Sequence, residues 1–532
     1  MASALDARFC TPEEAVADIR DGQTIATVAM TLVSASESNL KALERRFLET
    51  GHPRDLTLIH SCGQSDRERG IQHLAHEGMV RRIVGAHWGL QPKWMELIAN
   101  DAVEAYCLPQ GQMAQLYREA ASGLPGKLSR VGLGTFIDPR IEGGKMNRRT
   151  RDAEDLVEVV QLGGEEYLFY RALPIDWLLI RGTAADGQGN LTTTDEAMKL
   201  EVLPAVLATK RWGGKVVAQV RERVETGTLD PKDVTVPGVF VDSVVVCPDP
   251  ENDHRMTSSF YFDPSFCGQA RVPEEAIEPA PMNERKLIAR RGVCELYPGA
   301  VVNLGTGIPN DMVGRVAAEE GLSGDVMVTV ESGIYGGVQL GGVDFGIGQN
   351  LTAMVAHHEQ FDYYDGAGVD VTFMGLGELD GHGNVNSTKM GDRCAGAGGF
   401  IDITQNAKKV VFLGTFTAKG GRYRFEDGRL VIEREGEVRK MVPEVGQLSF
   451  NGRAARRAGQ DVLVVTERAV FRLVPEGVEL VEIAPGIDLK TQVLDLMGFE
   501  PIVSPDLKVM DPALFTVDGP AGIALGPRPE GR

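Results

Sequence analysis

The sequence predicts an α/β protein built of two related, doubly wound domains with mainly parallel sheets. Three observations predict this class: the length, the alternation of element types and an internal duplication. A chain of 532 residues is too long for one hydrophobic core, since single domains usually have about 100–250 residues. Short apolar runs typical of buried strands alternate with helical runs that end at glycines, which favours parallel sheets covered by helices.

The same order of elements occurs near the start and near the middle of the chain. Residues 11–14 (TPEE) form a capping box and predict a helix, followed by a glycine stop and a strand over residues 24–29. Near the middle, Asn283 is a helix cap for residues through 296, and a Pro-Gly stop precedes a strand over residues 300–304. A repeated helix, stop and strand indicates a duplication.

A second repeat places the two copies in one register. Residues 186–190 and 380–384 share the pattern D-G-x-G-N, and the apolar runs 216–220 and 410–414 are separated by the same 194 residues. A D-G-x-G-N run is typical of a tight turn, in which glycine supplies a positive φ and Asn closes the turn. We therefore interpret these residues as structural in both copies.

The duplication sets the expected domain boundaries. We expect a first domain over residues 1–270, a linker rich in proline and charge over residues 271–286, and a second domain over residues 287–516. Residues 517–532 are expected to be a poorly ordered tail.

Composition excludes several function classes. The formal charge of −20 argues against nucleic acid or an anionic membrane as a partner, and no apolar run is long enough to span a bilayer. The first residues carry no signal-peptide pattern, and the cysteines form no C-x-x-C pair, so we expect a cytoplasmic protein without a disulfide framework or zinc site. The seven cysteines are Cys10, Cys62, Cys107, Cys247, Cys267, Cys294 and Cys394.

Glu331 is the first candidate for chemistry. Five apolar or β-branched residues, 326–330, predict a buried strand that leads directly into Glu331-Ser-Gly. Ligands of parallel sheets bind at the carboxyl ends of strands, and the glycines at 333, 336 and 337 leave room for a close approach to the acid. From this segment alone, a reactive carboxylate and a turn carboxylate that bonds nearby backbone donors are both open.

Two glycine clusters and two amides are further candidates. Residues 305–310 (GTGIPN) lie between a strand and a helical run, like a phosphate cradle, but match neither G-x-G-x-x-G nor a Walker A motif. Gly398 and Gly399 open a predicted helix, where backbone N–H groups could stabilise an oxyanion; close helix–sheet packing is the alternative. Asn303 offers an amide to a substrate oxygen, and Gln110 offers another from a turn that is otherwise structural.

Metal and serine-hydrolase chemistry have no support in the motifs. His357, His358 and Glu359 are adjacent, but the chain has no H-E-x-x-H or comparable ligand spacing. No G-x-S-x-G elbow is present either, since Ser332 follows an acid. We expect no metal site.

Taken together, these motifs resemble those of the family I CoA-transferases, in particular the single-chain acetate/propionate and 3-oxoacid enzymes. The strand–Glu331–Ser–Gly element, residues 303–309 and residues 396–399 carry the resemblance. It extends over nearly the whole chain, with the first half similar to the α subunit of the family and the second half to the β subunit. The further matching segments are residues 47–58, 87–89, 108–111, 131–136, 166–170 and 483–488.

The resemblance implies a ping-pong transfer of CoA from an acyl-CoA to a free carboxylic acid, through a γ-glutamyl-CoA thioester on Glu331. Gly399 then matches the backbone oxyanion donor of the family, and Gly398, Asn303 and Gln110 are expected beside the reacting groups. It implies no metal or organic cofactor, since CoA is a substrate, and a homodimer or homotetramer. No motif marks the residues that bind the CoA phosphates.

One segment departs from the family. The family usually has a glycine-rich turn after the first strand, whereas residues 30–38 (MTLVSASES) are bulkier. Drift in a loop and an altered acyl or CoA pocket are both open. Two other functions also remain open: an acyl-CoA thioesterase, in which water resolves the intermediate, and a non-catalytic acyl-CoA sensor.

Overall fold

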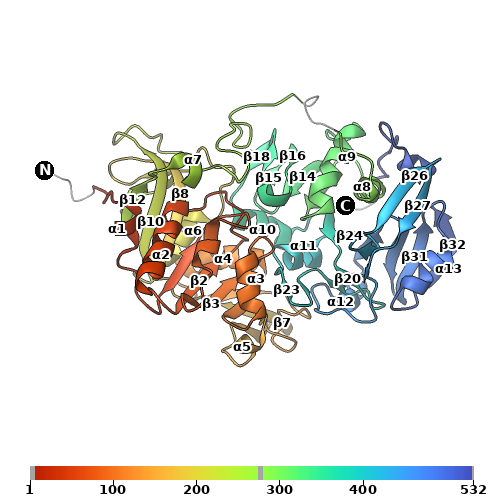
Figure 1. Cartoon of the computed structure of the whole chain (residues 1–532), viewed down its shortest axis with the longest axis horizontal. Coiled ribbons are helices and arrows are strands. Elements are labelled where there is room, and N and C mark those ends of the chain that lie inside the picture. Colours follow the sequence, from red (N-terminus) through yellow and green to blue (C-terminus); the bar gives the residue numbers. More distant parts are fainter. Residues whose placement is uncertain (1–5, 274–278, 530–532) are drawn as a thin grey trace.

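A computed structural model describes residues 6–273 and 279–529. The two halves of the chain lie side by side along the long axis of the molecule, the first half at the left of Figure 1 and the second at the right. Helices α4 (Gln110–Ala121), α10 (His357–Gly366) and α11 (Phe400–Asn406) lie where the halves meet, and α4 packs against both of the others.

The first half is built on a nine-stranded sheet. Its main path runs β12-β10-β8-β1-β2-β3-β4, and every pair along that path is parallel. All nine residues of β8 are buried, as expected for a parallel strand covered on both faces. The strands of this path are β1 (Thr24–Thr27), β2 (Leu56–His60), β3 (Val80–Gly85), β4 (Glu104–Cys107), β8 (Trp177–Ala185), β10 (Lys215–Arg223) and β12 (Ser243–Val246). The antiparallel strands β9 (Leu191–Thr192) and β11 (Val234–Val236) extend β8.

The second half has a ten-stranded sheet in the order β18-β15-β14-β13-β19-β24-β29-β30-β31-β32. Its five central strands are parallel: β14 (Met327–Val330), β13 (Val301–Leu304), β19 (Val371–Gly375), β24 (Lys409–Leu413) and β29 (Asp461–Val465). The outer strands are β15 (Ile334–Tyr335), β18 (Ala353–Met354), β30 (Ala469–Val474), β31 (Gly477–Ile483) and β32 (Ile502–Val509).

The duplication is visible in both topology and turns. The order β12-β10-β8-β1-β2 in the first half corresponds to β29-β24-β19-β13-β14 in the second. The two D-G-x-G-N turns are bonded alike: the carboxylate of Asp186 accepts from the backbone and side chain of Asn190, and Asp380 accepts in the same way from Asn384. The predicted α/β class, with two related parallel-sheet halves, is confirmed.

The remaining helices and strands complete the two halves. The other helices are α1 (Pro12–Val16), α2 (Glu37–Thr50), α3 (Pro92–Ala99), α5 (Arg148–Arg151), α6 (Val202–Arg211), α7 (Pro250–Asp253), α8 (Glu284–Val293), α9 (Gly314–Glu319), α12 (Gly452–Arg457) and α13 (Leu489–Gln492). Smaller sheets are formed by β5 (Gly126–Ser129), β6 (Val157–Leu162) and β7 (Glu165–Arg171), by β16 (Val338–Gln339) and β17 (Gly348–Gln349), by β20 (Glu378–Leu379) and β21 (Val385–Asn386), by β22 (Lys389–Met390) and β23 (Arg393–Cys394), by β25 (Thr417–Ala418) and β28 (Val438–Arg439), and by β26 (Arg422–Glu426) and β27 (Arg429–Arg434).

Local sequence signals explain the helix starts. The capping box predicted at residues 11–14 forms, with the Thr11 hydroxyl accepting from Glu14 and the Glu14 carboxylate accepting from Thr11. Asn283 caps α8 as predicted, but the helix ends at Val293 rather than at residue 296. Because α8 begins at Glu284, the last residues of the predicted linker are helical, and residues 274–278 of that linker lie outside the described part.

The C-terminal segment differs from the prediction of a poorly ordered tail. Residues 517–529 form no helix or strand, but Glu320 accepts hydrogen bonds from the backbone of Ala521 and Ile523, and Arg290 donates to the carbonyl of Gly519. Polar side chains of the second half therefore hold this segment. Among the residues described, no helix is long and apolar enough to cross a membrane.

Candidate active site

Glu331 lies at the carboxyl end of β14, one of the central parallel strands. Its side chain is only 6% exposed. Directly after it, Ser332 donates to the carbonyl of Gly346 at 2.6 Å, and Gly333 has a φ of 100°. A Cβ at Gly333 would lie 2.2 Å from the carbonyl oxygen of Val355, so only glycine permits this turn. The turn therefore fixes Glu331 at the edge of the sheet.

Gln110 reaches Glu331 from the other half of the chain. It is the first residue of α4, and its Nε2 donates to Oε1 of Glu331 at 3.2 Å. Its backbone N–H donates to the carbonyl of Gly398 at 3.0 Å, which ties α4 to the glycine cluster of the second half. The sequence could not show this meeting, because the two side chains are 221 residues apart.

The predicted glycines lie beside the same carboxylate. Gly399 is the N-cap of α11, and a Cβ there would lie 2.9 Å from Oε2 of Glu331. The N–H at an N-cap has no partner within its own helix, so it is available to a ligand. Gly398 has a φ of 54° and donates its N–H to the carbonyl of Ala86 at 2.9 Å. Gly399 therefore stays a candidate oxyanion donor, and Gly398 supports the cluster.

Asn303 is in the sheet beside the site but is turned into a polar network of its own. It is fully buried, its amide nitrogen donates to the Tyr364 hydroxyl at 3.0 Å, and its oxygen accepts from the Thr372 hydroxyl at 2.9 Å. It is not among the described residues that line the cavity at Glu331. Its contact with substrate stays a prediction.

Burial dominates the electrostatics of Glu331. Removal from water raises the pKa of this carboxyl from its ordinary value of 4.5 to about 7, against the opposing effects of His357 and the Gln110 amide. A carboxylate that is poorly solvated and exists in both protonation states near neutral pH is typical of a reactive group. These properties favour a reactive carboxylate over an ordinary turn carboxylate at Glu331.

His357 is a contact of the site that sequence reasoning missed. This fully buried side chain at the start of α10 lies with its Nε2 3.0 Å from Nε2 of Gln110. Its Nδ1 lies 2.6 Å from Oε2 of Glu201, a buried acid of the first half that also accepts from the Ser61 hydroxyl. The pair of adjacent histidines gave no signal for this role, since Glu201 is 156 residues away in sequence.

A cavity of about 500 Å³ opens onto Glu331 and is lined by both halves. Arg393 is the one lysine or arginine among its described lining residues, and Asp311, the other lining carboxylate, is paired with Arg285 at 2.5 Å. Residues 305–307, the cradle-like glycines of the sequence analysis, also line it. The apolar part of the wall comes from Met30, Leu90, Phe345, Met374, Leu376, Met390 and Phe400.

The segment that departs from the family forms part of this wall. Met30 and Thr31 both line the cavity, and Thr31 holds a φ of 52°, an unusual conformation for a β-branched residue. The Thr31 N–H donates to the carbonyl of Gly63, another lining residue, at 2.7 Å. Residues 30–31 therefore form part of the cavity wall, where an altered acyl or CoA pocket, rather than drift in a loop, stays a prediction.

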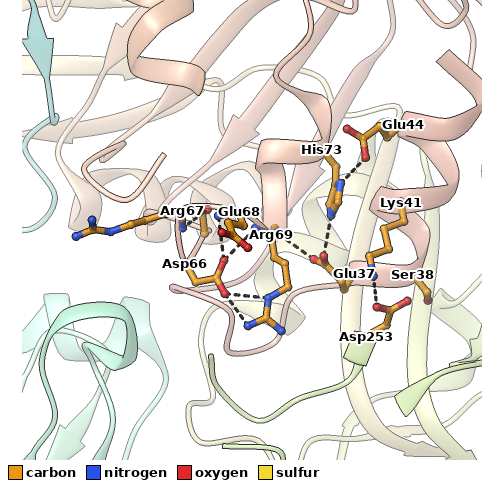
Figure 2. A network of polar contacts seen from close by, with 12 residues as sticks. Glu37, Ser38, Lys41, Glu44, Asp66, Arg67, Glu68, Arg69, His73 and Asp253 are labelled. Atoms are coloured by element: carbon orange, nitrogen blue, oxygen red, sulfur yellow. Dashed lines mark hydrogen bonds and ion pairs between the residues drawn. The ribbon is translucent and has the colours of Figure 1, made fainter. Parts of the chain in front are cut away.

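A network of ion pairs and hydrogen bonds connects helix α2 to the loop that contains Asp66 (Figure 2). Glu37, at the start of α2, accepts from the backbone of Gly70 at 2.9 Å and lies 2.7 Å from Nε2 of His73. The other ring nitrogen of His73 lies 2.5 Å from Glu44, and Asp66 pairs with Arg69 at 2.6 Å. This network joins α2, which follows the segment of Thr31, to residues 66–73, which follow Gly63.

Comparison with known proteins decides the family. The sequence profile described as "Coenzyme A transferase" matches residues 9–247. The chain is 43% identical to the caffeate CoA-transferase of Acetobacterium woodii, over 96% of this chain and 98% of that protein. It is 42% identical to the acetate CoA-transferase YdiF of Escherichia coli K12, over 91% of this chain and 90% of that protein. The chain belongs to the family I CoA-transferases. The family predicted from the motifs is thereby confirmed.

The CoA-transferase fold is matched over the whole chain. The apoenzyme crystal structure of the acyl-CoA transferase YdiF from E. coli O157:H7 superposes with a TM-score of 0.92 at 38% identity, covering 99% of each chain. A second crystal structure of that enzyme, described as a thioester complex with CoA, superposes with a TM-score of 0.90 at 39% identity, covering 98% of this chain and 99% of that one. The protein is an enzyme of the CoA-transferase type.

Proposed function

We propose that this CoA-transferase moves CoA from an acyl-CoA to a free carboxylic acid by ping-pong chemistry through a γ-glutamyl-CoA thioester on Glu331. The observation that carries the proposal is the placement of Glu331. A buried carboxylate with a raised pKa opens onto a cavity that both halves line, with the Gln110 amide on one oxygen and Gly399 beside the other.

The first half-reaction takes CoA from the donor. The Glu331 carboxylate attacks the thioester carbonyl, the C–S bond breaks, and an acyl-glutamyl anhydride and CoA thiolate are formed. The thiolate then attacks the glutamyl carbonyl carbon. The bond between that carbon and the bridging oxygen of the anhydride breaks, and the donor acid leaves as a carboxylate. The γ-glutamyl-CoA thioester remains, and the Gly399 N–H stabilises the oxyanion of each tetrahedral intermediate.

The second half-reaction reverses these steps with another acid. The acceptor carboxylate attacks the glutamyl thioester, which releases CoA thiolate and forms a new anhydride between the acceptor and Glu331. The thiolate then attacks the carbonyl carbon that came from the acceptor. The new acyl-CoA leaves and the Glu331 carboxylate is restored, so no net proton, oxidant or cofactor is consumed. Water must be kept from both intermediates, which suits an acid that is 6% exposed.

The relatives support the mechanism and bound the substrate class. One structure of the similar enzyme YdiF is described as a thioester complex with CoA. Relatives of similar identity are named for caffeate and for acetate, an aromatic and a very short acid. We infer small carboxylic acids as donors and acceptors, with the apolar wall at Met30 and Phe345 in contact with the acyl group. We also propose a homodimer or homotetramer in the cytoplasm.

The experiment is intact-mass analysis of the protein mixed with a panel of acyl-CoAs, from acetyl-CoA to an aromatic acyl-CoA, without an acceptor acid. A gain of one CoA less water, labile to hydroxylamine and mapped to Glu331, is the expected result. Glu331→Gln should show no gain. Steady release of CoA without acceptor would instead indicate a thioesterase, and CoA binding without any adduct would indicate a sensor.

A further inference from the structure

The Gln110 amide nitrogen faces two acceptors at once. Its Nε2 lies 3.2 Å from Oε1 of Glu331 and 3.0 Å from Nε2 of His357. An amide nitrogen carries two hydrogens and accepts none, so this arrangement is satisfied only when Nε2 of His357 bears no proton. The single proton of a neutral His357 ring is then on Nδ1.

Glu201 accounts for that proton. Its Oε2 lies 2.6 Å from Nδ1 of His357, and both side chains are fully buried. A buried carboxylate at this distance accepts the Nδ1 proton and fixes the tautomer and the ring orientation. A continuous chain of hydrogen bonds therefore runs from Glu201 through His357 and Gln110 to Glu331, and it crosses three times between the halves.

A second proton on His357 would disrupt this chain. It would point from Nε2 at the hydrogens of the Gln110 amide, so the amide would have to turn over and present its oxygen to the ring. The turned amide would also place that oxygen against Oε1 of Glu331, which is favourable only if Glu331 is itself protonated. The amide of Gln110 thus couples the two protonation states.

We propose that His357, held by Glu201, is a positioning residue that keeps the Gln110 amide hydrogens turned to Glu331, so that His357 and the nucleophile gain and lose their protons together. The inference rests on the proposed role of Glu331 as nucleophile. Its consequence is that the reactive state, Glu331 as carboxylate with a neutral His357, is two protons away from the inactive state.

The coupling rests on the two contacts of the Gln110 amide, because the charges alone oppose it: a protonated His357 lowers the pKa of Glu331. Burial alone would lower the pKa of His357, but Cys62 and Glu201 raise it well above its usual range, and burial raises that of Glu331. The pKa values of both groups therefore lie above their ordinary values. The titratable groups near His357 are the Cys62 thiol, the neighbouring His358 and the carboxyls of Glu201 and Glu331, and the Tyr117 hydroxyl interacts with Glu201 and Cys62.

The test is the pH dependence of single-turnover adduct formation on Glu331, measured by rapid quench and intact mass. The donor is the acyl-CoA of the panel that labels the wild-type protein. In the wild type, the logarithm of the rate should rise with a slope approaching two on the acid side, because two protons leave together. In His357→Gln the slope should fall to one, since only Glu331 then titrates.

Two variants of His357 separate its contacts. The side-chain oxygen of His357→Gln can still accept from Gln110 near the position of Nε2, so its rate at pH 8 should stay within a few-fold of wild type. The shorter side chain of His357→Asn places its amide near the position of Nδ1 but does not reach that of Nε2. The Gln110 amide then loses its orientation, which should lower the rate by about 100-fold. His358→Gln is the matched control: its Nδ1 has no hydrogen-bond partner in the described part of the chain, and it should behave as wild type.

A double-variant cycle shows whether His357 acts through Gln110. In a Gln110→Ala background, His357→Asn should cause little further loss of rate, and a full 100-fold loss there would overturn the proposal. In the pH experiment, a slope of one in the wild type or a slope of two in His357→Gln would overturn it as well. Thermal melting of each variant comes first. If a His357 variant does not fold, Glu201→Gln takes its place, and an unchanged rate and slope in that variant would also overturn the proposal. If the wild type forms no adduct, the proposed function itself fails.

Discussion

The amide nitrogen of Gln110 lies 3.2 Å from Oε1 of Glu331, and this hydrogen bond joins the first half of the chain to the second at the proposed nucleophile. Gln110 starts α4, and Glu331 ends β14. Neither half contains the whole site, since the cavity at Glu331 is lined from both. Because both halves belong to one chain, every copy of Glu331 has a copy of Gln110 beside it.

The buried charge of Glu331 should reduce stability at high pH. Its pKa is raised from 4.5 to about 7, so the folded protein retains this proton where the unfolded chain has lost it, and the wild type loses stability as the pH rises across that window. Glu331→Gln should therefore be the more stable protein above pH 7, by at most about 3 kcal/mol, and the difference should shrink below pH 4.5. Thermal melting at both pH values measures it. The exposed Glu49→Gln is the control and should show no such trend.

Gly399→Ala should inactivate the enzyme, and thermal melting should accompany the assay because the added Cβ would also lie 2.9 Å from the Phe361 ring. The added Cβ would lie 2.9 Å from Oε2 of Glu331, and displacement of the nucleophile by a fraction of an ångström or more should cost about 100-fold in the rate of adduct formation. The control is Gly324→Ala, where a Cβ meets nothing within 4 Å and φ is not positive. Equal rates for both variants would exclude Gly399 from the reacting centre.

Thr31→Gly should change the choice of acyl group more than it changes stability. Glycine removes a side chain from the cavity wall and adopts the φ of 52° without strain, which offsets the flexibility it adds to the unfolded chain. We expect a change of at most about 1 kcal/mol in the free energy of unfolding. The ratio of kcat/KM for an aromatic acyl-CoA to that for acetyl-CoA should shift by about 10-fold, as expected for one or two carbon-sized changes in an apolar pocket.

Ser34→Gly is the matched control for that variant. Ser34 lies in the same segment and also has a positive φ of 62°, but it is not among the described residues that line the cavity. An equal shift in both variants would mean that the flexibility of the segment, rather than the Thr31 side chain, sets the preference.

Arg393→Ala should weaken the binding of an anionic part of the substrate. It is the one lysine or arginine among the described residues of the cavity wall, and charge-assisted hydrogen bonds contribute about 1.5–3 kcal/mol, so KM for the acyl-CoA should rise at least about 10-fold. The exposed Arg457→Ala, on α12, is the control. A rise with acetyl-CoA indicates contact with a CoA phosphate, whereas a rise confined to succinyl-CoA indicates contact with the substrate carboxylate.

The sequence by itself determined the fold class and the duplication, and it indicated Glu331 as the candidate nucleophile. Strand runs and glycine stops are local patterns, and the strand–Glu331–Ser–Gly element is contiguous, so it can be found in the sequence, although its chemistry follows only from the resemblance of several such motifs to the family. The D-G-x-G-N turns at Asp186 and Asp380 formed as predicted for the same reason: each turn is closed by residues within the motif.

Only the tertiary structure decided which distant side chains meet Glu331. His357 and Glu201 come together across 156 residues, and Gln110 reaches Glu331 across 221, through the packing of α4 against α10 rather than through any sequence pattern. Packing also turned the Asn303 amide toward Tyr364 and Thr372, and made Thr31 part of the cavity wall. Burial, which raises the pKa of Glu331, is likewise a property of the assembled halves, because no local segment can exclude water from a carboxylate.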